Sequence, residues 1–565
     1  MISDDILYLT LCTAFMAVHY ILWRRQLLGF HPALSATSFL PFIATVVSLA
    51  ASNFEICLLP AYLGSVLYTF SFAAKSAKRF LPVMIVSAVM AVSSVIPCLT
   101  AESYREPSFL PEFNEVFTMM KRHYVLGDYK GIDWDGLYEE YSPRIKALER
   151  GDEEEFKKLC FEFGNEFPDP HVSIVPKEAA MSDAPVTAIC TDLSGNDLGF
   201  CGVRLDDGRI LAVNVSPDSA IYEAGLRDGS ELLAFDGTDI NEYVDSTKPA
   251  FMNFADADNL NFVRPITAFG IEGTSAELTF KTEDGSEVTA EATSVGTKNF
   301  ARSRTVMRKL RAYDEDDVNM SWEALGDDTA RLIFNGVNSF TAQLNDEEME
   351  MLREMWDANM RNPKDPPYPN PYETYIMNRT FDEMEEKGMK KLIIDVRCNG
   401  GGELELSAFL ASFFTDEELF VASEQYKDFY GNTITTDPIT TGDKPANRWG
   451  DKEIVILVGC DTASAAEIFT RALSPLPNVT VMGITESAGC AMAISGSNTK
   501  NVIYGFPMLK MVDENGDILI DSGTDMQQKL PLDIKIPFDE NAFEEIFIKN
   551  NDYALDYALD YLKNK

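Results

Sequence analysis

The stretch Lys391-Leu-Ile-Ile-Asp395-Val-Arg-Cys-Asn399-Gly-Gly-Gly402 decides the fold, because an apolar strand runs directly into a triple glycine. Glycine turns of this kind let the backbone approach a ligand closely. A second apolar strand, Ile454–Val458, runs into small residues and then a helix that contains Ser464 and Glu467. From Thr329 onward, strands alternate with helices, and this alternation predicts α/β crossover units.

The two strand ends permit more than one chemistry. No Gly-Lys-Ser/Thr follows the triple glycine, so a nucleotide phosphate loop has little support. A serine at a strand-to-helix turn, as Ser464 is, can expose its hydroxyl while backbone N–H groups face a developing oxyanion. Small residues at a helix start also serve packing or capping alone, and the pattern by itself leaves this alternative open.

The chain of 565 residues is too long for a single hydrophobic core, so we expect several domains. Residues 105–180 carry apolar residues at helical spacing and predict a helical cap. Residues 181–300 hold short alternating runs broken by Gly and Asp, which predict a β domain. Residues 301–565 hold the α/β core.

Charge divides the sequence into two unlike parts. The net charge is −41, with 48 Lys and Arg against 89 Asp and Glu. Residues 1–100 contain five basic and three acidic side chains, which leaves 43 basic and 86 acidic residues on 101–565. Such acidity argues against a nucleic-acid partner, because binding to the phosphate backbone rests on clustered Lys and Arg.

The first hundred residues contain four apolar runs: Ile6–Trp23, Ser38–Ser52, Ile56–Ala74 and Phe80–Leu99. Runs near 20 residues predict about four transmembrane helices that anchor the chain in a lipid bilayer, with buried helical hairpins as the alternative. Basic residues follow the first run and separate the last two. The positive-inside rule then places residues 101–565 on the extracytoplasmic side of a multi-pass membrane protein.

Histidines and cysteines limit the chemistry. Of four histidines, only His123 and His171 follow the apolar runs, and His171 lies in a Pro-Asp-Pro-His turn that leads into a strand. His171 is therefore the better candidate for a base by elimination, with a structural histidine as the alternative. Closely spaced histidines and paired CxxC cysteines are absent, so we expect no metal and no cofactor.

Three motifs occur together in an order that resembles the S41 family of serine peptidases, which includes C-terminal processing proteases and the tricorn core protease. They are the Pro-Asp-Pro-His171 turn, the triple-glycine strand end and Thr462-Ala-Ser464-Ala-Ala-Glu467. The segment Gly225–Gly237 resembles the second half of a PDZ module. The resemblance implies a helical cap, a PDZ-like domain and a ClpP/crotonase-like α/β core.

The resemblance also implies roles for single residues. Ser464 matches the nucleophile, Ala465 and Gly401 match the oxyanion hole, and Glu467 matches an acid one helical turn on. Processing proteases carry a lysine downstream of the serine, but residues 483–491 contain none. Tricorn-like members instead place a histidine where His171 stands, and a supporting acid where Asp521 stands.

The function implied is a membrane-anchored, extracytoplasmic serine endopeptidase that cleaves polypeptides through a Ser464 acyl-enzyme, with His171 as base. An unrecognised base, and a lapsed enzyme that only binds peptides as a receptor, stay open as alternatives. The PDZ-like module implies binding of substrate C-termini. Its candidate loop contains Gly199, Phe200, Cys201 and Gly202, and an ordinary strand entry is the alternative.

Overall fold

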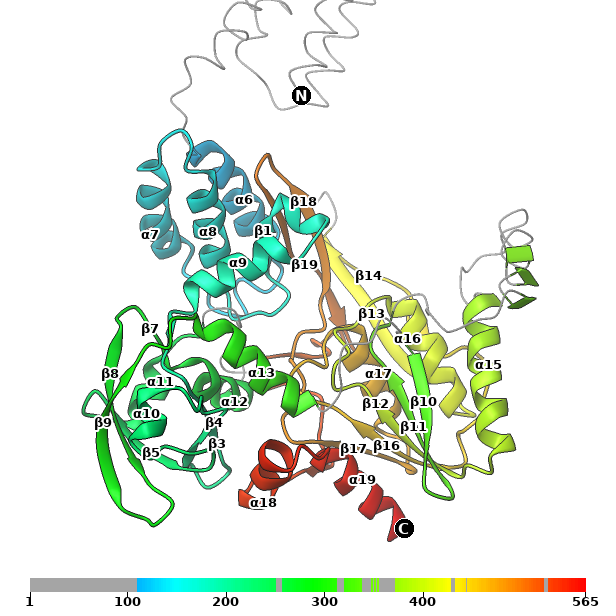
Figure 1. Ribbon diagram of the computed structural model, residues 1–565. Helices are drawn as coiled ribbons and strands as arrows, with labels where there is room; N and C mark the ends of the chain where they lie inside the picture. The colour runs from blue at the N-terminus through cyan, green and yellow to red at the C-terminus, as the bar shows by residue number, and fades with distance from the viewer. Residues whose placement is uncertain are drawn as a thin grey trace, which may run out of the picture. The chain divides into compact units, whose positions relative to one another are not determined.

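The computed structural model describes residues 109–249, 257–311, 320–337, a few positions between 347 and 354, 371–427, 432–443, 445–522 and 527–565 (Figure 1). The chain divides into two units, Met1–Ser108 and Phe109–Lys565, and all described residues belong to the second. The four apolar runs predicted to span a membrane lie outside the described residues.

The membrane component of the predicted fold class is corrected. Within the described ranges, no helix has both the length and the apolar character that crossing a bilayer requires. Helix α15 (Pro371–Glu386), for example, has 16 residues and carries several acidic side chains. The prediction of about four transmembrane helices is therefore wrong on this finding. The multi-pass localisation and the extracytoplasmic placement that depended on it are withdrawn.

A six-stranded sheet forms the centre of the α/β core. Its order is β10-β11-β12-β16-β17-β22, and every neighbouring pair is parallel except β10 with β11. The expected crossover architecture is confirmed here. The strands are β10 (Met320–Leu325), β11 (Thr329–Phe334), β12 (Lys391–Asp395), β16 (Glu453–Leu457), β17 (Val479–Gly483) and β22 (Ile534–Lys535).

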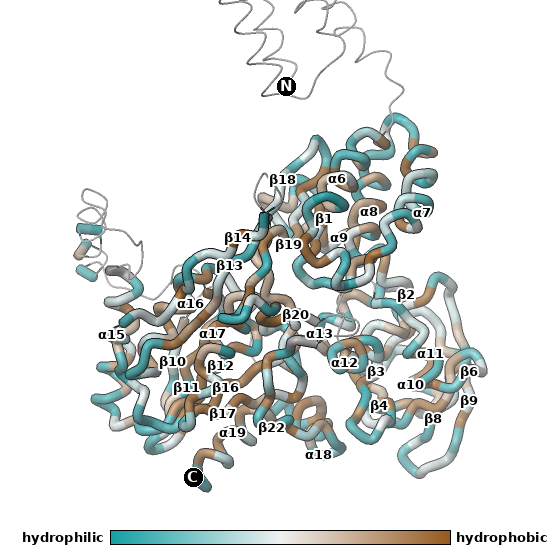
Figure 2. The backbone as a smooth tube through the Cα atoms, turned by 180° about the vertical axis from the view of Figure 1, so that it is seen from behind, coloured by the Kyte–Doolittle hydropathy of each residue, from teal (hydrophilic) through white to brown (hydrophobic). Residues whose placement is uncertain are grey.

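Helices cover both faces of this sheet, because alternate side chains of a strand point to opposite faces. Leu392 and Ile394 of β12 belong to the buried cluster that includes α15, α16 (Leu404–Ala411) and α17 (Ala465–Leu473). Ile393, between them, packs with α19 (Tyr553–Lys563). Apolar residues therefore follow the inner strands, as the brown segments around β16 and β17 in Figure 2 show.

A second sheet joins the helical cap to the core. Strand β19 (Val502–Val512) pairs antiparallel with β1 (Ser173–Pro176), β18 (Ala493–Asn498) and β13 (Phe420–Lys427). Strand β1 follows the cap helices α6 (Leu110–His123), α7 (Trp134–Lys146) and α8 (Glu153–Gly164). This pairing fixes the end of the cap, with His171, to the C-terminal half of the chain.

A third sheet lies between the cap and the core in sequence. Its order is β3-β4-β5-β8-β9, all antiparallel, and it has a buried apolar cluster of its own. The strands are β3 (Cys201–Arg204), β4 (Ile210–Val213), β5 (Glu231–Phe235), β8 (Ser275–Lys281) and β9 (Glu287–Thr293). Helix α12 (Ala257–Thr267), which the alternating pattern did not predict, packs beside the edge strand β3.

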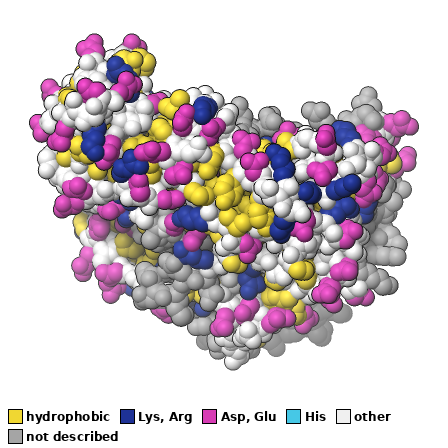
Figure 3. All heavy atoms as spheres, turned by 90° about the horizontal axis from the view of Figure 1, so that it is seen from below, with side chains coloured by type: hydrophobic (Ala, Val, Ile, Leu, Met, Phe, Trp, Pro, Cys, Tyr) yellow, Lys and Arg dark blue, Asp and Glu magenta, His cyan; other side chains and the backbone are white. Residues whose placement is uncertain are grey.

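Acidic side chains are spread over the face seen in Figure 3, with basic side chains among them. Buried charge is arranged differently. Asp395, at the end of β12, is fully buried and accepts from Arg331 at 2.7 Å and Arg397 at 2.6 Å. Arg397 also pairs with Asp552 at 2.8 Å, directly before α19. This network ties the C-terminal helix to the strand that carries the triple glycine.

We predict that Asp395→Asn lowers the free energy of unfolding by about 3–5 kcal/mol, because it removes the fully buried carboxylate that both Arg331 and Arg397 contact, while their other partners, Asp552 and Glu323, are more exposed. Burial raises the pKa of Asp395, but Arg397 and Arg331 lower it by more, so the net effect is a pKa below the ordinary value. Urea denaturation measures the effect. The control Asp560→Asn removes the exposed pair with Lys563 and should change stability by less than about 1 kcal/mol. Equal effects of the two variants would contradict the prediction.

Candidate active site

Ser464 stands at a strained strand-to-helix turn. It is the N-cap of α17, with φ +56° and ψ −125°, a backbone conformation that residues other than glycine rarely adopt. Strain of this kind persists only where the surroundings enforce it, and it clusters at functional sites. The next residue, Ala465, begins the helix, so its N–H has no acceptor within the helix.

The triple-glycine turn packs directly against Ser464. Gly401 has φ +98°, and a Cβ atom there would lie 2.5 Å from Ser464 Cβ and 2.8 Å from Ala465 N. The Asn399 carbonyl accepts the Ala463 N–H at 3.0 Å, which joins the two turns. The Gly401 N–H, however, donates to Asn399 Oδ1 at 2.9 Å. The group expected to serve in an oxyanion hole is thus engaged within its own turn.

Glu467 is a buried carboxylate that accepts four hydrogen bonds. Oε2 accepts the N–H groups of Ser464 and Cys490, both at 3.0 Å. Oε1 accepts the Ser487 hydroxyl at 2.6 Å and the Gly489 N–H at 2.9 Å. Burial raises the pKa of Glu467 to about 7, and these hydrogen bonds oppose the rise. The carboxylate therefore fixes the 487–490 loop to the nucleophile turn.

The same loop leads to the other two predicted residues. The Cys490 carbonyl accepts the Ser464 N–H at 3.0 Å, and Cys490 forms an antiparallel bridge with Asp521. Burial and Lys130 lower the pKa of His171, while Asp169 and a hydrogen bond to the Met492 backbone raise it by less. The imidazole is consequently neutral near pH 7.

In the described part of the chain, no hydrogen bond joins Asp521 to His171. Its carboxylate is fully buried, and Oδ1 lies 2.5 Å from the Nζ of Lys130, also buried. The Nδ1 atom of His171 is buried without a hydrogen-bond partner in the described part of the chain. The His171 backbone N–H donates to Asp169 Oδ1 at 2.9 Å, and the Tyr124 hydroxyl donates to Asp169 Oδ2 at 2.6 Å.

Sequence reasoning missed Lys130, Asp169 and Tyr124. Asp169 stands within the Pro-Asp-Pro-His motif, so its position beside the histidine was a usable signal. Lys130 and Tyr124 lie in a helical region with many charges and carry no motif. Only the tertiary structure brings these two residues to the C-terminal half of the chain.

The candidate peptide loop is built into the third sheet. Phe200 and Cys201 are fully buried, and a Cβ atom at Gly202 would meet Phe269 at 2.8 Å. The Gly199 N–H donates to Asp197 Oδ1 at 2.7 Å. Cys201 belongs to the same buried cluster as Cys490, so the third sheet packs against the loop that Glu467 holds.

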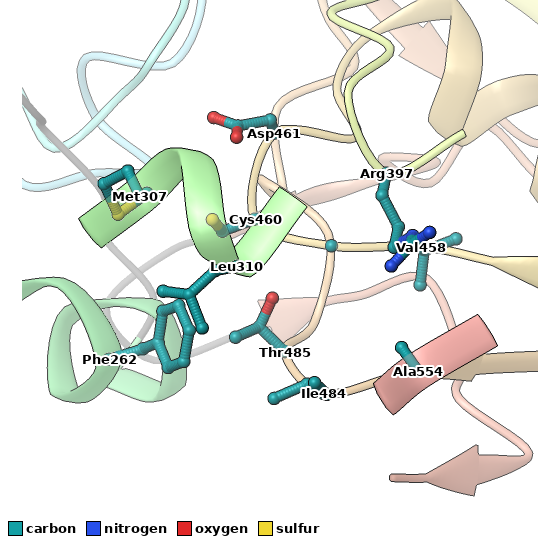
Figure 4. A pocket seen from close by; sticks show the side chains of 11 residues that line it. Phe262, Met307, Leu310, Arg397, Val458, Cys460, Asp461, Ile484, Thr485 and Ala554 are labelled. Atoms are coloured by element: carbon teal, nitrogen blue, oxygen red, sulfur yellow. The ribbon is translucent and has the colours of Figure 1, made fainter. Parts of the chain in front are cut away.

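Two cavities differ in what they can admit. Figure 4 shows a cavity of about 40 Å³ among Arg397, Cys460, Asp461 and Thr485, which has room for water rather than peptide. A larger cavity of about 710 Å³ lies between the cap and β18–β19, and Tyr124 and Tyr129 line it. The Tyr129 hydroxyl donates to the Asp521 carbonyl at 3.2 Å, but Ser464, His171 and Asp521 are not among the residues that line this cavity.

Comparison with known proteins identifies the fold. Residues 372–526 match the profile of Peptidase family S41, and residues 107–163 match the Tricorn protease C1 domain. The structure of mature CPAF complexed with lactacystin aligns with a TM-score of 0.50 at 14% identity, over 80% of this chain and 97% of that one. The core therefore has an S41 serine peptidase fold, and the resemblance seen in the sequence is confirmed at this level.

Curated relatives match over shorter segments. The carboxy-terminal processing protease CtpA of Bacillus subtilis is 27% identical over 160 residues, 28% of this chain. A probable CtpA-like serine protease of Staphylococcus aureus is 35% identical over 97 residues, 17% of this chain. The matches span 33% and 18% of those proteins. The enzyme class of these relatives, serine-type peptidase, is the class that the sequence predicted.

We predict that Gly401→Ala destabilises the protein by about 1–3 kcal/mol, because its Cβ would overlap Ser464 Cβ and its φ is positive. The matched control is Gly400→Ala, where a Cβ atom meets nothing within 4 Å. Urea denaturation of both variants measures the difference. Equal stability of the two would contradict the packing of this turn on the nucleophile.

Glu467 makes stability depend on pH. Its pKa, about 7, exceeds the ordinary value of 4.5, so the unfolded state loses this proton first as pH rises. We expect the contribution of Glu467 to the free energy of unfolding to fall by about 3 kcal/mol as the pH rises from about 4.5 to 7, and to stay constant above pH 7. Urea denaturation of wild type and Glu467→Gln across this range measures it, since the variant lacks that slope. Parallel profiles would contradict the prediction.

Proposed function

We propose that this protein is a serine endopeptidase in which Ser464 is the nucleophile and His171 the general base. The observation that carries the proposal is the 487–492 loop. It is bonded to the Ser464 turn through Glu467 and Cys490, to His171 through Met492, and to Asp521 through the Cys490 bridge. One short segment is thus linked to Ser464, Glu467, His171 and Asp521, and this supports assigning the nucleophile, the base and its supporting acid among them.

In the proposed reaction, neutral His171 takes the proton of Ser464 Oγ as the oxygen attacks the scissile carbonyl carbon. The tetrahedral oxyanion accepts a hydrogen bond from the Ala465 N–H. It accepts a second one from the Gly401 N–H once that group has left Asn399 Oδ1. Collapse breaks the C–N bond, and His171 returns the proton to the leaving amine. Water, deprotonated by His171, then hydrolyses the acyl-enzyme and regenerates Ser464. Asp521 orients the imidazole and stabilises its charged form.

Two cavities in the described part of the chain are large enough to admit parts of a polypeptide. The cavity of about 710 Å³ backed by Tyr124 and Tyr129 is large enough for several side chains. A second cavity, of about 320 Å³, lies between Arg204 at the end of β3 and Asn261 in α12. An edge strand beside a helix suits strand addition by an extended peptide, so we propose a PDZ-like role for the third sheet in binding substrate ends.

A peptide-binding protein without catalysis is the second candidate. Three observations favour it: no lysine follows Ser464 in residues 483–491, the Gly401 N–H is bonded to Asn399, and Asp521 is paired with Lys130. Such a protein would bind the same extended peptides and leave them intact. The two candidates differ in the reactivity of Ser464 alone.

We predict that a fluorophosphonate probe labels wild type and that Ser464→Ala abolishes both labelling and casein cleavage. The matched control is Ser474→Ala at the other end of helix α17, whose hydroxyl bonds to the Arg471 carbonyl. It should keep wild-type labelling. His171→Ala should slow labelling by about 10²-fold or more, because it removes the base.

The outcomes separate the candidates. Peptide binding without labelling, in a folded wild type, would favour the receptor and reject the peptidase. Labelling that persists in Ser464→Ala would show a different nucleophile. Full activity of His171→Ala would reject the base assignment and leave Ser464 in place.

A further inference from the structure

Lys130 is a buried lysine aimed at the proposed catalytic acid. Its side chain is fully buried, in the segment between α6 and α7. The Nζ atom lies 2.5 Å from Asp521 Oδ1 and donates to the Pro168 carbonyl at 2.9 Å. An ammonium group loses several kcal/mol of hydration on burial, so it is retained only where a partner compensates it.

The partners of Lys130 belong to the site. Asp521 is the proposed acid, and Pro168 lies three residues before His171. Asp169, between them in the motif, is also fully buried, and its carboxylate accepts the His171 N–H and the Tyr124 hydroxyl. Lys130 therefore contacts both the motif that carries the base and the strand that carries the acid.

The surrounding charges oppose ionisation of Asp521. Its pKa lies well above the ordinary value: burial raises it most, Asp169 and Glu467 raise it further, and Lys130 lowers it without cancelling that rise. Two carboxylates that share a buried site cannot both ionise without a countercharge. Cys490 is buried and its pKa lies well above the usual range, so the thiol is neutral. Burial and Asp169 likewise raise the pKa of the nearby Tyr124, so its phenol is neutral.

We propose that Lys130 is a positioning residue that favours the charged form of Asp521, the form that can support the imidazolium of His171. The proposal rests on the proposed function. The proton removed from Ser464 passes to His171 and then to the leaving amine, while Lys130 keeps its three protons throughout. Its contribution is electrostatic: a neutral Asp521 would carry no negative charge to stabilise the imidazolium and would accept only a weaker hydrogen bond from its Nδ1–H.

A structural role and a positioning role predict different results. A lysine needed only for folding affects stability and leaves the catalytic constants of the folded fraction unchanged. A lysine that favours the charged form of Asp521 affects kcat, leaves KM nearly unchanged, and moves the pH profile. Without Lys130 the acid ionises only at higher pH, so activity should fall near pH 7 and recover in part as pH rises.

The test uses the full chain with Lys130→Met and steady-state cleavage of a fluorogenic casein peptide between pH 5.5 and 9.5. We expect kcat near pH 7 to fall by about 10²-fold, KM to change by less than about threefold, and the acid limb to move upward. Lys157→Met is the matched control, because Lys157 is a buried lysine of the same cap, paired with Glu154 and Glu178. It should keep the wild-type pH profile.

A double-variant cycle guards against loss of folding. Lys130→Arg keeps the charge and should recover part of kcat, with urea denaturation reporting the folded fraction of each variant. If Lys130 acts through Asp521, adding Lys130→Met to Asp521→Asn should lower kcat no further. The proposal would be overturned if the effects of Lys130→Met and Asp521→Asn on kcat were fully additive. It would also be overturned if Lys130→Met were folded and kept the wild-type pH profile. A wild type inert to fluorophosphonate and peptide would overturn the proposed function as well, so the two failures are distinguishable.

Discussion

The geometry of the site depends on one buried carboxylate. Glu467 accepts hydrogen bonds from Ser464, Ser487, Gly489 and Cys490, and it has no contact with solvent. Each of these backbone donors would be costly to leave unpaired in the interior. The strained Ser464 conformation is thereby enforced from two sides, by Glu467 within its own helix and by the Gly401 turn packed against it. Removing the carboxylate would release the turn and the loop together.

Backbone pairing carries this constraint outward. The loop held by Glu467 continues into β18, which pairs with β19, and β19 pairs with β1 through Ser173 and Gly505. Strand β1 begins two residues after His171. The sheet register thus places the histidine motif, and the hydrogen bond of the His171 side chain to the Met492 backbone adds to it, while Nδ1 has no partner in the described residues. The ion pair between Lys130 of the cap and Asp521 provides a second link between the cap and the C-terminal half of the chain.

The sequence predicted what depends on local pattern and not what depends on long-range contacts. Strands 391–395 and 454–457 follow from apolar runs beside glycine and small residues, and the motif order correctly indicated the S41 fold. Helix α12 was missed because the alternating runs around it favoured strands. Lys130 was missed because a lysine in a charged helical region is ordinarily exposed. The membrane prediction concerned residues 1–100, which lie outside the described residues, and within the described part no helix is long and apolar enough to cross a bilayer.

Two contacts of the resting site compete with contacts that catalysis needs. Gly401 N–H is bonded to Asn399 instead of facing an oxyanion, and Asp521 is paired with Lys130 while His171 Nδ1 is unbonded. Exchanging a neutral hydrogen bond for one to an oxyanion is favourable, since bonds to charged groups are about twice as strong. Breaking the hydrogen bond from Gly401 N–H to Asn399 therefore costs about 1 kcal/mol, and the hydrogen bond to the oxyanion in the transition state compensates this cost. The Lys130 contact need not break, because a carboxylate has two oxygens and Lys130 approaches Oδ1 alone. Both competing contacts are thus compatible with an active enzyme, and the weight of the peptidase proposal falls on the reactivity of Ser464.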